Sequence, residues 1–409
     1  MLGPYNERHS QCSGNFAAAY ISLDSSLICT NEREMSFFLH TARKTPVVRQ
    51  LPAEKTAIAG SSAEQIPSAH GWLWWTCYLV AWAAALTLLV GAALRIFYHD
   101  GTYYLTWFNA FTRYVYVPAY ACLAWAVWQR RWSLAVAGSA IVLCHLAWMA
   151  PDFMRDRRFD TPAATSAKTI SDTPSLRIFF ANVLQTNRET DAMLQEIAAA
   201  DPDVLVLAEW GSRWNQAFRN SPLSTVYVHG ISTRQRHFGN VAIFSRLPLL
   251  REMQNSVARR LVRTASIQLG SQTLRIVVLH APRPMYDADY DYVGFWNQMI
   301  PLLATEPRPL LVIGDFNATE HSLVYQRLKA LGLRSAHDDR GCGYATTWPN
   351  GAYWLPPIRI DQAFLSPEVE CERIVEGRGK GSDHKPLIVD VRLRDGAPGH
   401  RPPLAAKYE

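Results

Sequence analysis

Several short apolar runs in the second half of the chain end in residues whose side chains bind metal ions or transfer protons. Loops at strand ends on a rigid scaffold are common places for active sites. Each residue alone is more often a turn former, a helix cap or a hydrogen-bonded structural group, but the repetition within one domain favours a site. The residues at these ends are Asn182, Glu209, His280, Asp315, Asn317, Asp361, Asp383 and His384.

This set is rich in carboxylate and amide oxygens, which suit Mg²⁺ or Mn²⁺ better than zinc. The His-x-x-x-His and Cys-x-x-Cys spacings of many zinc sites do not occur in the sequence. Neither a Walker phosphate loop nor a G-x-S-x-G serine elbow is present. A cation held by few carboxylates and several waters most often serves phosphoryl chemistry. The residues therefore predict a divalent-metal site that acts on phosphate.

The elements that must position these residues are short β-rich runs separated by helices. Helical spacing of Met193, Leu194 and Ile197 predicts a helix over 190–200. Strands are expected at residues 176–182, 204–208, 241–244, 261–269, 274–279, 310–313, 360–365 and 387–391. A chain segment of this size and pattern predicts one α+β domain built on packed sheets, over residues 175–395.

Composition differs strongly between the parts of the 409-residue chain. It is 49% hydrophobic but 19% charged, with 14 Trp that are concentrated before residue 151. The charged fraction is below the ~25% usual for soluble proteins. This composition excludes a wholly disordered, collagen-like or disulfide-scaffold protein. The net charge of +6 suits an anionic substrate or a membrane surface without choosing between them.

Three apolar stretches before the α+β domain predict a membrane region over residues 71–151. Residues 71–94 carry no charge and exceed the ~20 residues that cross a bilayer as a helix. Residues 133–150 form a second uncharged stretch flanked by tryptophans. Residues 109–128 are interrupted by Arg113 and Pro118, which a membrane helix tolerates if the arginine reaches the headgroups. We expect three transmembrane helices, with two as the alternative.

The distribution of basic residues predicts the orientation. Lys and Arg in the tail before the first span, and Arg130 with Arg131 after the second, favour the cytoplasm for both segments. Alternation then places the α+β domain outside the cytoplasm. Basic residues at 155–158 argue for the opposite orientation. Outside these regions, 1–70 is expected to be a disordered cytoplasmic tail, 152–174 a linker and 396–409 a disordered tail.

The motifs together resemble the endonuclease/exonuclease/phosphatase superfamily, which has the DNase I-like fold. The similarity covers about residues 176–394 and is carried by the strand ends at Asn182, Glu209 and His280 and by four short motifs. The motifs are GNVAIFSR at 239–246, GDFN at 314–317, RID at 359–361 and GSDH at 381–384. The apolar stretches, TWP at 347–349 and PPIRID at 356–361 are similar to its VanJ-like membrane-anchored branch. The resemblance implies a four-layer α/β sandwich preceded by three transmembrane helices.

The resemblance also implies a role for each residue. Glu209 is expected to be the main Mg²⁺ (or Mn²⁺) ligand, assisted by Asn182 and Asp383. Asp315 would orient or deprotonate the attacking water, while Asn317 and His280 would bind phosphate oxygens. His384, oriented by Asp361, would act as a general acid/base or as a cationic phosphate clamp. A strand-end salt bridge between Asp361 and Arg359 is the structural alternative.

The leading functional hypothesis is a membrane-anchored, metal-dependent phosphoesterase at the cell envelope. Its expected substrate is a phosphate mono- or diester, including one attached to a lipid. The alternatives are an extracytoplasmic nuclease acting on nucleic acid, and a catalytically silent envelope binding or resistance protein. A disulfide between Cys342 and Cys371 stays open, because two cysteines and an oxidising exterior permit it without requiring it.

Overall fold

In a computed structural model of the protein, residues 69–154, 175–232, 240–284, 292–351 and 354–394 are described. The chain divides into two compact units, residues 1–77 and 78–409, and helix α1 (Ala69–Tyr98) runs from the first into the second. The tails predicted at 1–70 and 396–409 lie outside the described residues, except for the first two residues of α1. Most of the predicted linker is likewise outside them, while Asp152 and Phe153 belong to helix α5 (Trp132–Phe153).

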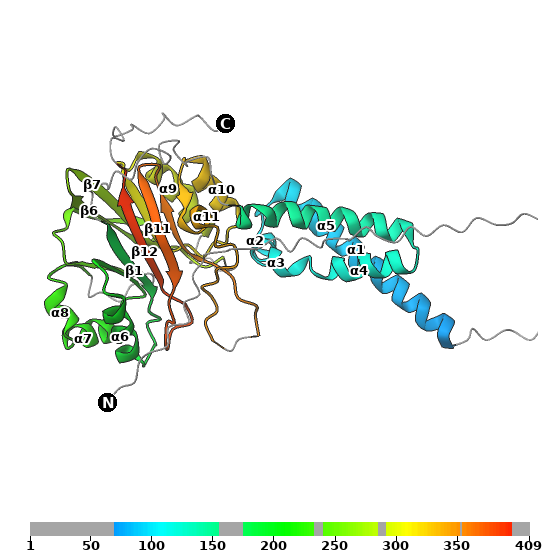
Figure 1. The fold of residues 1–409 in the computed structure, drawn as a ribbon, viewed down its shortest axis with the longest axis horizontal. Helices are drawn as coiled ribbons and strands as arrows, with labels where there is room; N and C mark the ends of the chain where they lie inside the picture. The colour runs from blue at the N-terminus through cyan, green and yellow to red at the C-terminus, as the bar shows by residue number, and fades with distance from the viewer. Residues whose placement is uncertain (1–68, 155–174, 233–239, 285–291, 352–353, 395–409) are drawn as a thin grey trace, which may run out of the picture. The chain divides into compact units, whose positions relative to one another are not determined.

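Two six-stranded sheets form the centre of the α+β domain (Figure 1). The first has the order β11 (Val369–Glu376), β12 (Leu387–Leu393), β1 (Leu176–Asn182), β2 (Val204–Ala208), β4 (Val241–Ser245) and β3 (His229–Ile231). The second has the order β5 (Leu250–Val257), β6 (Arg260–Leu269), β7 (Gln272–His280), β8 (Leu310–Asp315), β10 (Asp361–Leu365) and β9 (Arg334–Ser335).

Both faces of the central strands are buried, which explains their continuous apolar sequences. In β1, Ile178 and Phe180 belong to the core between the two sheets, while Phe179 and Ala181 face a second core on the other side. That second core includes side chains of α6 (Thr190–Ala200), α7 (Ser212–Arg219) and α8 (Leu223–Val226). A third core joins the outer face of the other sheet to α9 (Tyr292–Thr305) and α10 (Leu323–Ala330). The predicted four-layer α/β sandwich is therefore confirmed.

The strands that sequence pattern did not predict are β3, β5, β9 and β11. Strand β9 has two residues and β3 has three. Most of β5 is exposed to solvent, so it lacks the apolar residues that mark a buried strand. The remaining strands and the helix at 190–200 lie where the sequence predicted them, within a few residues at their ends.

The residues before the sandwich form helices α1, α2 (Tyr103–Ala110), α3 (Thr112–Val115), α4 (Pro118–Trp128) and α5. Two segments are long and apolar enough to cross a membrane, Trp72–Tyr98 and Trp132–Phe153. The middle stretch is broken near Phe111 and again before Pro118, and α4 has 11 residues, about 16 Å of helix. A bilayer core is ~30 Å thick. The expectation of three transmembrane helices is therefore not confirmed.

The interpretation of Arg113 was wrong. Its side chain does not extend toward a lipid headgroup but is buried and pairs with Glu320, with 2.5 Å between Nη2 and Oε1. The same guanidinium also donates a hydrogen bond to the carbonyl oxygen of Gly343. A charge in an otherwise apolar stretch has a partner here because the chain folds back against the sandwich.

Candidate active site

Strand pairing brings the predicted site residues to one edge of the sandwich. In the first sheet, Asn182 at the end of β1 pairs with Ala208 of the parallel strand β2, and Glu209 follows directly. In the second sheet, Asp315 at the end of β8 pairs with His280 of β7 on one side and with Asp361 of β10 on the other. The parallel strands β1 and β2, and likewise β7 and β8, end at this edge, and the antiparallel strand β10 begins there with Asp361.

Asp315 links the two sheets. Its Oδ2 accepts a hydrogen bond from Nδ2 of Asn182 at 3.1 Å, and its Oδ1 accepts one from the backbone N–H of Asn317 at 3.0 Å. His280 Nε2 lies 3.5 Å from the same Oδ2. Burial raises the pKa of Asp315 to about 7, and the nearby positive charge of His384 only partly opposes this effect. A carboxyl group with a pKa near neutrality suits a general base, because it is ionised at working pH yet still basic.

His384 and Asp361 form a buried hydrogen-bonded pair. Nδ1 of His384 lies 2.8 Å from Oδ2 of Asp361, whose side chain is 0% exposed. Nε2 of His384 lies 3.8 Å from Asp315. Burial alone would lower the pKa of His384, but the charges of Asp361 and Asp315 outweigh burial and raise this pKa to about 10. The imidazole is therefore positively charged at neutral pH and faces the pocket edge of the sheet.

Two side chains hold this pair in place, and neither had a role predicted from the sequence. Thr347 Oγ1 accepts hydrogen bonds from the backbone N–H groups of Ile360 and Asp361, both at 3.1 Å. Ser382 Oγ accepts from the N–H of His384 at 3.1 Å and donates to the carbonyl of Asn182 at 2.7 Å. The TWP and GSDH motifs were visible in the sequence, but their hydroxyl contacts depend on strands distant in the chain.

The alternative salt bridge between Asp361 and Arg359 does not form. Arg359 is directed to Glu320 and Asp338, with closest distances of 3.6 and 3.7 Å. Asp361 begins β10, whereas Arg359 lies two residues earlier, before the strand, and its guanidinium is directed to these other carboxylates. Asp361 therefore belongs to the same group of residues as His384.

His280 is buried, and its pKa is lowered to about 3 by burial and by the positive charges of Arg260 and His384. It is therefore neutral at physiological pH. Its Nδ1 has no hydrogen-bond partner among the described residues. A neutral imidazole can donate one hydrogen bond and accept another, which is compatible with the predicted contact to a phosphate oxygen.

Glu209 has a backbone conformation that is uncommon for its residue type. Its φ is +58°, in the left-handed region that costs an L-residue roughly 1–2 kcal/mol. Its carboxylate accepts hydrogen bonds from the backbone N–H of Gln185 at 3.1 Å and from Nδ2 of Asn182 at 3.2 Å. The side chain is half-buried and lines a pocket. Strain at a residue that faces a pocket is typical of functional positions.

The other predicted metal ligands differ in their geometry. Asn182 directs Nδ2 at Glu209 and Asp315, while its Oδ1 accepts from the N–H of Leu184 at 3.1 Å. It therefore orients the Glu209 carboxylate in this structure. Asp383 lines the same pocket and accepts a hydrogen bond from the Trp348 indole at 3.3 Å. Two accessible carboxylates, Glu209 and Asp383, thus supply the oxygen donors that suit a hard cation.

Asp315, Asp361 and His384 also have ligand atoms within 4.8 Å of one another. A cation among them would meet a charged imidazolium, because Asp361 already binds Nδ1 of His384. This group is better suited to proton transfer and charge stabilisation than to holding a metal.

The pocket has a volume of about 220 Å³. The predicted site residues in its wall are Glu209, His280, Asp315, Asn317, Asp383 and His384. Asn317 has a φ of +48°, which an Asn tolerates, and its Nδ2 donates to the carbonyl of Ala281 at 2.9 Å. A second part of the wall comes from Thr106, Trp107 and Ala110 of α2. These residues lie in the predicted membrane region and had no predicted role in the site.

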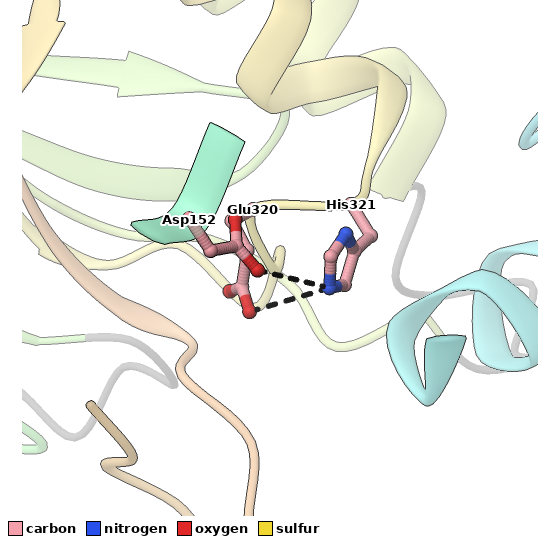
Figure 2. A group of neighbouring side chains, drawn as sticks. All are labelled: Asp152, Glu320 and His321. Carbon is pink, nitrogen blue, oxygen red and sulfur yellow. Dashed lines mark ion pairs between the residues drawn. The ribbon is translucent and has the colours of Figure 1, made fainter. Parts of the chain in front are cut away.

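A second acidic group lies where α5 meets the loop after β8, and it consists of Asp152, Glu320 and His321 (Figure 2). His321 Nε2 lies 3.5 Å from Glu320 and 3.6 Å from Asp152. Burial opposes ionisation of Glu320, but Arg359 and Arg113 outweigh burial and lower its pKa to about 2. Because Arg113 and Arg359 pair with Glu320, and Arg113 also lies near Asp152, the group is a buried ion-pair network that joins the helices to the sandwich.

The two cysteines of the sandwich do not form a disulfide. Cys371 is a buried free thiol, and burial raises its pKa to about 12. The bridge to Cys342 that the sequence left open is therefore absent.

A known protein family matches the sandwich. Residues 178–384, about half of the chain, match the Endonuclease/Exonuclease/phosphatase family. No curated protein sequence matches the chain. The three activities in the family's description all break phosphate ester bonds, in agreement with the predicted phosphate-ester hydrolase.

Solved structures are similar at low sequence identity. TDP2 of D. rerio, complexed with a single-strand DNA product, is 16% identical with a TM-score of 0.44, over 53% of this chain and 98% of its own. The human Nocturnin catalytic domain with a bound sulfate anion is 18% identical with a TM-score of 0.41, over 54% and 94%. An endonuclease/exonuclease/phosphatase from Beutenbergia cavernae is 15% identical with a TM-score of 0.40, over 54% and 72%.

These comparisons concern the sandwich and do not confirm the narrower resemblance to the VanJ-like branch. The family match, residues 178–384, covers the pocket residues of the sandwich but not those of α2. The chain therefore belongs to the endonuclease/exonuclease/phosphatase family.

Proposed function

We propose that the protein is a membrane-anchored, divalent-metal-dependent phosphoesterase that hydrolyses a phosphate mono- or diester. The observation that carries this proposal is the Asp361–His384 pair beside Asp315 at the edge of a pocket. His384 provides a positive charge that can bind a phosphate, and the Asp315 carboxylate is basic enough to accept a proton from water.

In the proposed reaction, Asp315 orients a water molecule and accepts its proton as the oxygen attacks phosphorus. Attack forms a new P–O bond, and the ester P–O bond breaks on the opposite side. His384 stabilises the negative charge that develops on the phosphate oxygens and is kept protonated by Asp361. Asn317 and His280 donate hydrogen bonds to phosphate oxygens. The leaving oxygen takes a proton from solvent or from His384.

Glu209 and Asp383 would hold the divalent cation, with Asn182 orienting Glu209 from the neighbouring strand. Such an ion, Mg²⁺ or Mn²⁺, would supply further positive charge against the phosphate. The half-exposed Glu209 carboxylate, held by two hydrogen bonds and in a strained backbone conformation, supports this assignment.

The proposed membrane anchor is supported by side chains that α1 and α5 leave exposed. Examples are Trp72 and Trp75 of α1 and Val136, Leu143 and Leu146 of α5, all more than half exposed. A soluble protein rarely exposes so many large apolar residues in one region.

The proposal includes a third crossing, made by α4 together with the residues from Thr112 that precede it, because α4 alone is shorter than a bilayer core. Arg95 Nη1 donates to Thr112 Oγ1 at 2.6 Å, while the Tyr78 and Trp125 rings lie 6.5 Å apart. Residues 112–125 thus run antiparallel to residues 78–95 of α1. The chain then crosses three times, Arg130 and Arg131 face the cytoplasm, and the sandwich lies outside it.

The test is phosphate release by the full chain in lipid nanodiscs, with Mg²⁺ or Mn²⁺, from alkyl phosphates, nucleotides and DNA. We expect hydrolysis of at least one phosphate ester, abolished by EDTA and by Asp315→Asn. Asp390→Asn is the matched control, because this buried carboxylate pairs with Arg177 on β1 outside the pocket. Activity that survives Asp315→Asn would refute the proposed site, and activity confined to DNA would favour a nuclease.

A further inference from the structure

The pocket has one polar wall from the sandwich and one largely apolar wall that includes α2. We infer that Trp107 of α2 is a specificity-determining residue, and that the esterified group of the substrate is apolar where it joins the phosphate. This inference rests on the proposed phosphoesterase function and names the class of substrate for it.

Contacts of α2 and of its neighbours α1 and α3 with loops beside the catalytic strands fix the position of α2. Trp107 Nε1 donates to the carbonyl of Pro284, after β7, at 2.6 Å. Arg95 Nη2 donates to the carbonyl of His321, after β8, at 3.3 Å. On the next helix, Tyr114 Oη donates to the carbonyl of Pro357, before β10, at 2.6 Å. The three loops belong to the strands that carry His280, Asp315 and Asp361, so α2 is a built part of the site.

The chemistry of this wall favours an apolar group. The Trp107 side chain is half-buried, and its N–H already donates to Pro284. Ala110 lies three residues further on the same helix face. Thr106 Oγ1 donates to the carbonyl of Thr102 at 3.1 Å. The hydrogen-bonding atoms of the two polar side chains are thus directed to protein groups.

Arg283, Thr319 and Ser322 also line the pocket, and Ile358 and Ile360 add to the apolar surface that Trp107 and Ala110 offer. A sugar or nucleobase placed here would lose hydrogen bonds to water without gaining equivalent ones. An alkyl or aromatic group would instead bury surface against the indole. The volume of about 220 Å³ is below the ~300–1,000 Å³ of typical ligand pockets, so it suits the phosphate and the first part of the attached group.

The experiment uses alkylphosphonates, whose P–C bond resists hydrolysis, so that binding is measured independently of turnover. Methyl-, butyl- and hexylphosphonate are titrated calorimetrically into the full chain in nanodiscs with Mg²⁺, and into empty nanodiscs. We expect the native protein to bind hexylphosphonate about tenfold or more tightly than methylphosphonate. Trp107→Ala should remove most of this difference while methylphosphonate affinity stays within about twofold, which also shows that the site remains folded.

Two further variants distinguish the apolar contact surface of Trp107 from its structural hydrogen bond. Trp107→Phe keeps an aromatic surface but loses the hydrogen bond to Pro284, so it should retain the preference for the longer chain. Trp128→Ala removes a 78% exposed Trp at the end of α4, away from the pocket, and should behave like the native protein.

The inference would be overturned if the native protein showed no preference for the longer alkyl chain, or if Trp107→Ala kept that preference unchanged. Equal losses in Trp107→Phe and Trp107→Ala would also overturn it, because they would assign Trp107 a purely structural role. Failure of the proposed function has a different signature. In that case hexylphosphonate binds with the expected preference, but hexyl phosphate is not hydrolysed.

Discussion

The Asp361–His384 pair offers the sharpest test of the proposed chemistry. Asp361→Asn keeps the size of the side chain but removes the negative charge 2.8 Å from His384 Nδ1. His384→Ala removes the imidazole. If the two residues act as one unit, the double variant should be little slower than the slower single variant, because effects within a unit are strongly non-additive.

The magnitude follows from the geometry. Two unit charges at this 2.8 Å separation interact by about 6 kcal/mol at an effective dielectric constant of ~20, which corresponds to about four pKa units. The pKa of His384, about 10 in the native protein, should therefore fall toward its ordinary value of 6.5 or below in Asp361→Asn. At pH 8 the imidazole would be neutral, and the loss of charge stabilisation should lower kcat by roughly 10²–10³-fold.

The assay is kcat/KM for a phosphate ester measured from pH 5 to pH 10 for the native protein, both single variants and the double variant. The native limb due to His384 should lie at high pH, and Asp361→Asn should move it to lower pH with partial recovery of activity below pH 6. Asp390→Asn serves as the control and should keep the native profile. Additive losses together with an unmoved limb would refute the pair, and Asp361 would then have only a structural role.

Four further predictions concern the metal, the buried carboxylates and the topology. Glu209→Gln should lower activity by orders of magnitude with little effect on Tm and should be partly rescued by higher Mg²⁺, whereas full native activity in EDTA would exclude the metal. The pKa of Asp315 is raised from 3.8 to about 7 in the folded state, so the contribution of this group to stability is lost as pH rises through 7. In EDTA at pH 8, Asp315→Asn should therefore raise Tm. An unchanged or lower Tm would contradict the raised pKa. Glu320→Gln leaves Arg113 and Arg359 without their buried partner and should lower the free energy of unfolding by about 3–5 kcal/mol in chemical denaturation. Glu372→Gln, at the partly exposed pair with Arg392, is the control and should lower it by under about 1 kcal/mol. Similar losses in the two variants would show that the network is not structural. Alkaline phosphatase fused after residue 170 should be active and a fluorescent protein fused there dark, and the reverse pattern would place the sandwich in the cytoplasm.

Much of the sandwich was predictable from local pattern. The strands buried on both faces are continuous apolar runs, and α6 shows helical spacing of Met193, Leu194 and Ile197. These signals depend only on the side-chain periods of strands and helices. The candidate residues were also recognisable, because a polar side chain at the end of an apolar strand is conspicuous. The resemblance to a known family then implied a role for each of them. The exposed strand β5 and the two-residue strand β9 had no such signal.

The tertiary structure decided which polar residues become partners. Arg359 precedes Asp361 by two residues, yet its charge is directed to Glu320, while Asp361 binds His384 on a loop far along the chain. Arg113 looked like a membrane-interface residue and instead pairs with Glu320. Partner choice of this kind depends on strand register and on where separate segments meet, neither of which is encoded in local spacing.

The sequence by itself therefore determined the apolar helices, the layered α+β domain and the identity of the catalytic candidates, because each has a local signature. Only the tertiary structure placed Asp315 between His280 and Asp361 through strand pairing, and Trp107 of helix α2 in the wall of the pocket. The physical reason is that hydrophobic periodicity acts over a few residues, whereas a pocket is formed by side chains that long-range packing brings together.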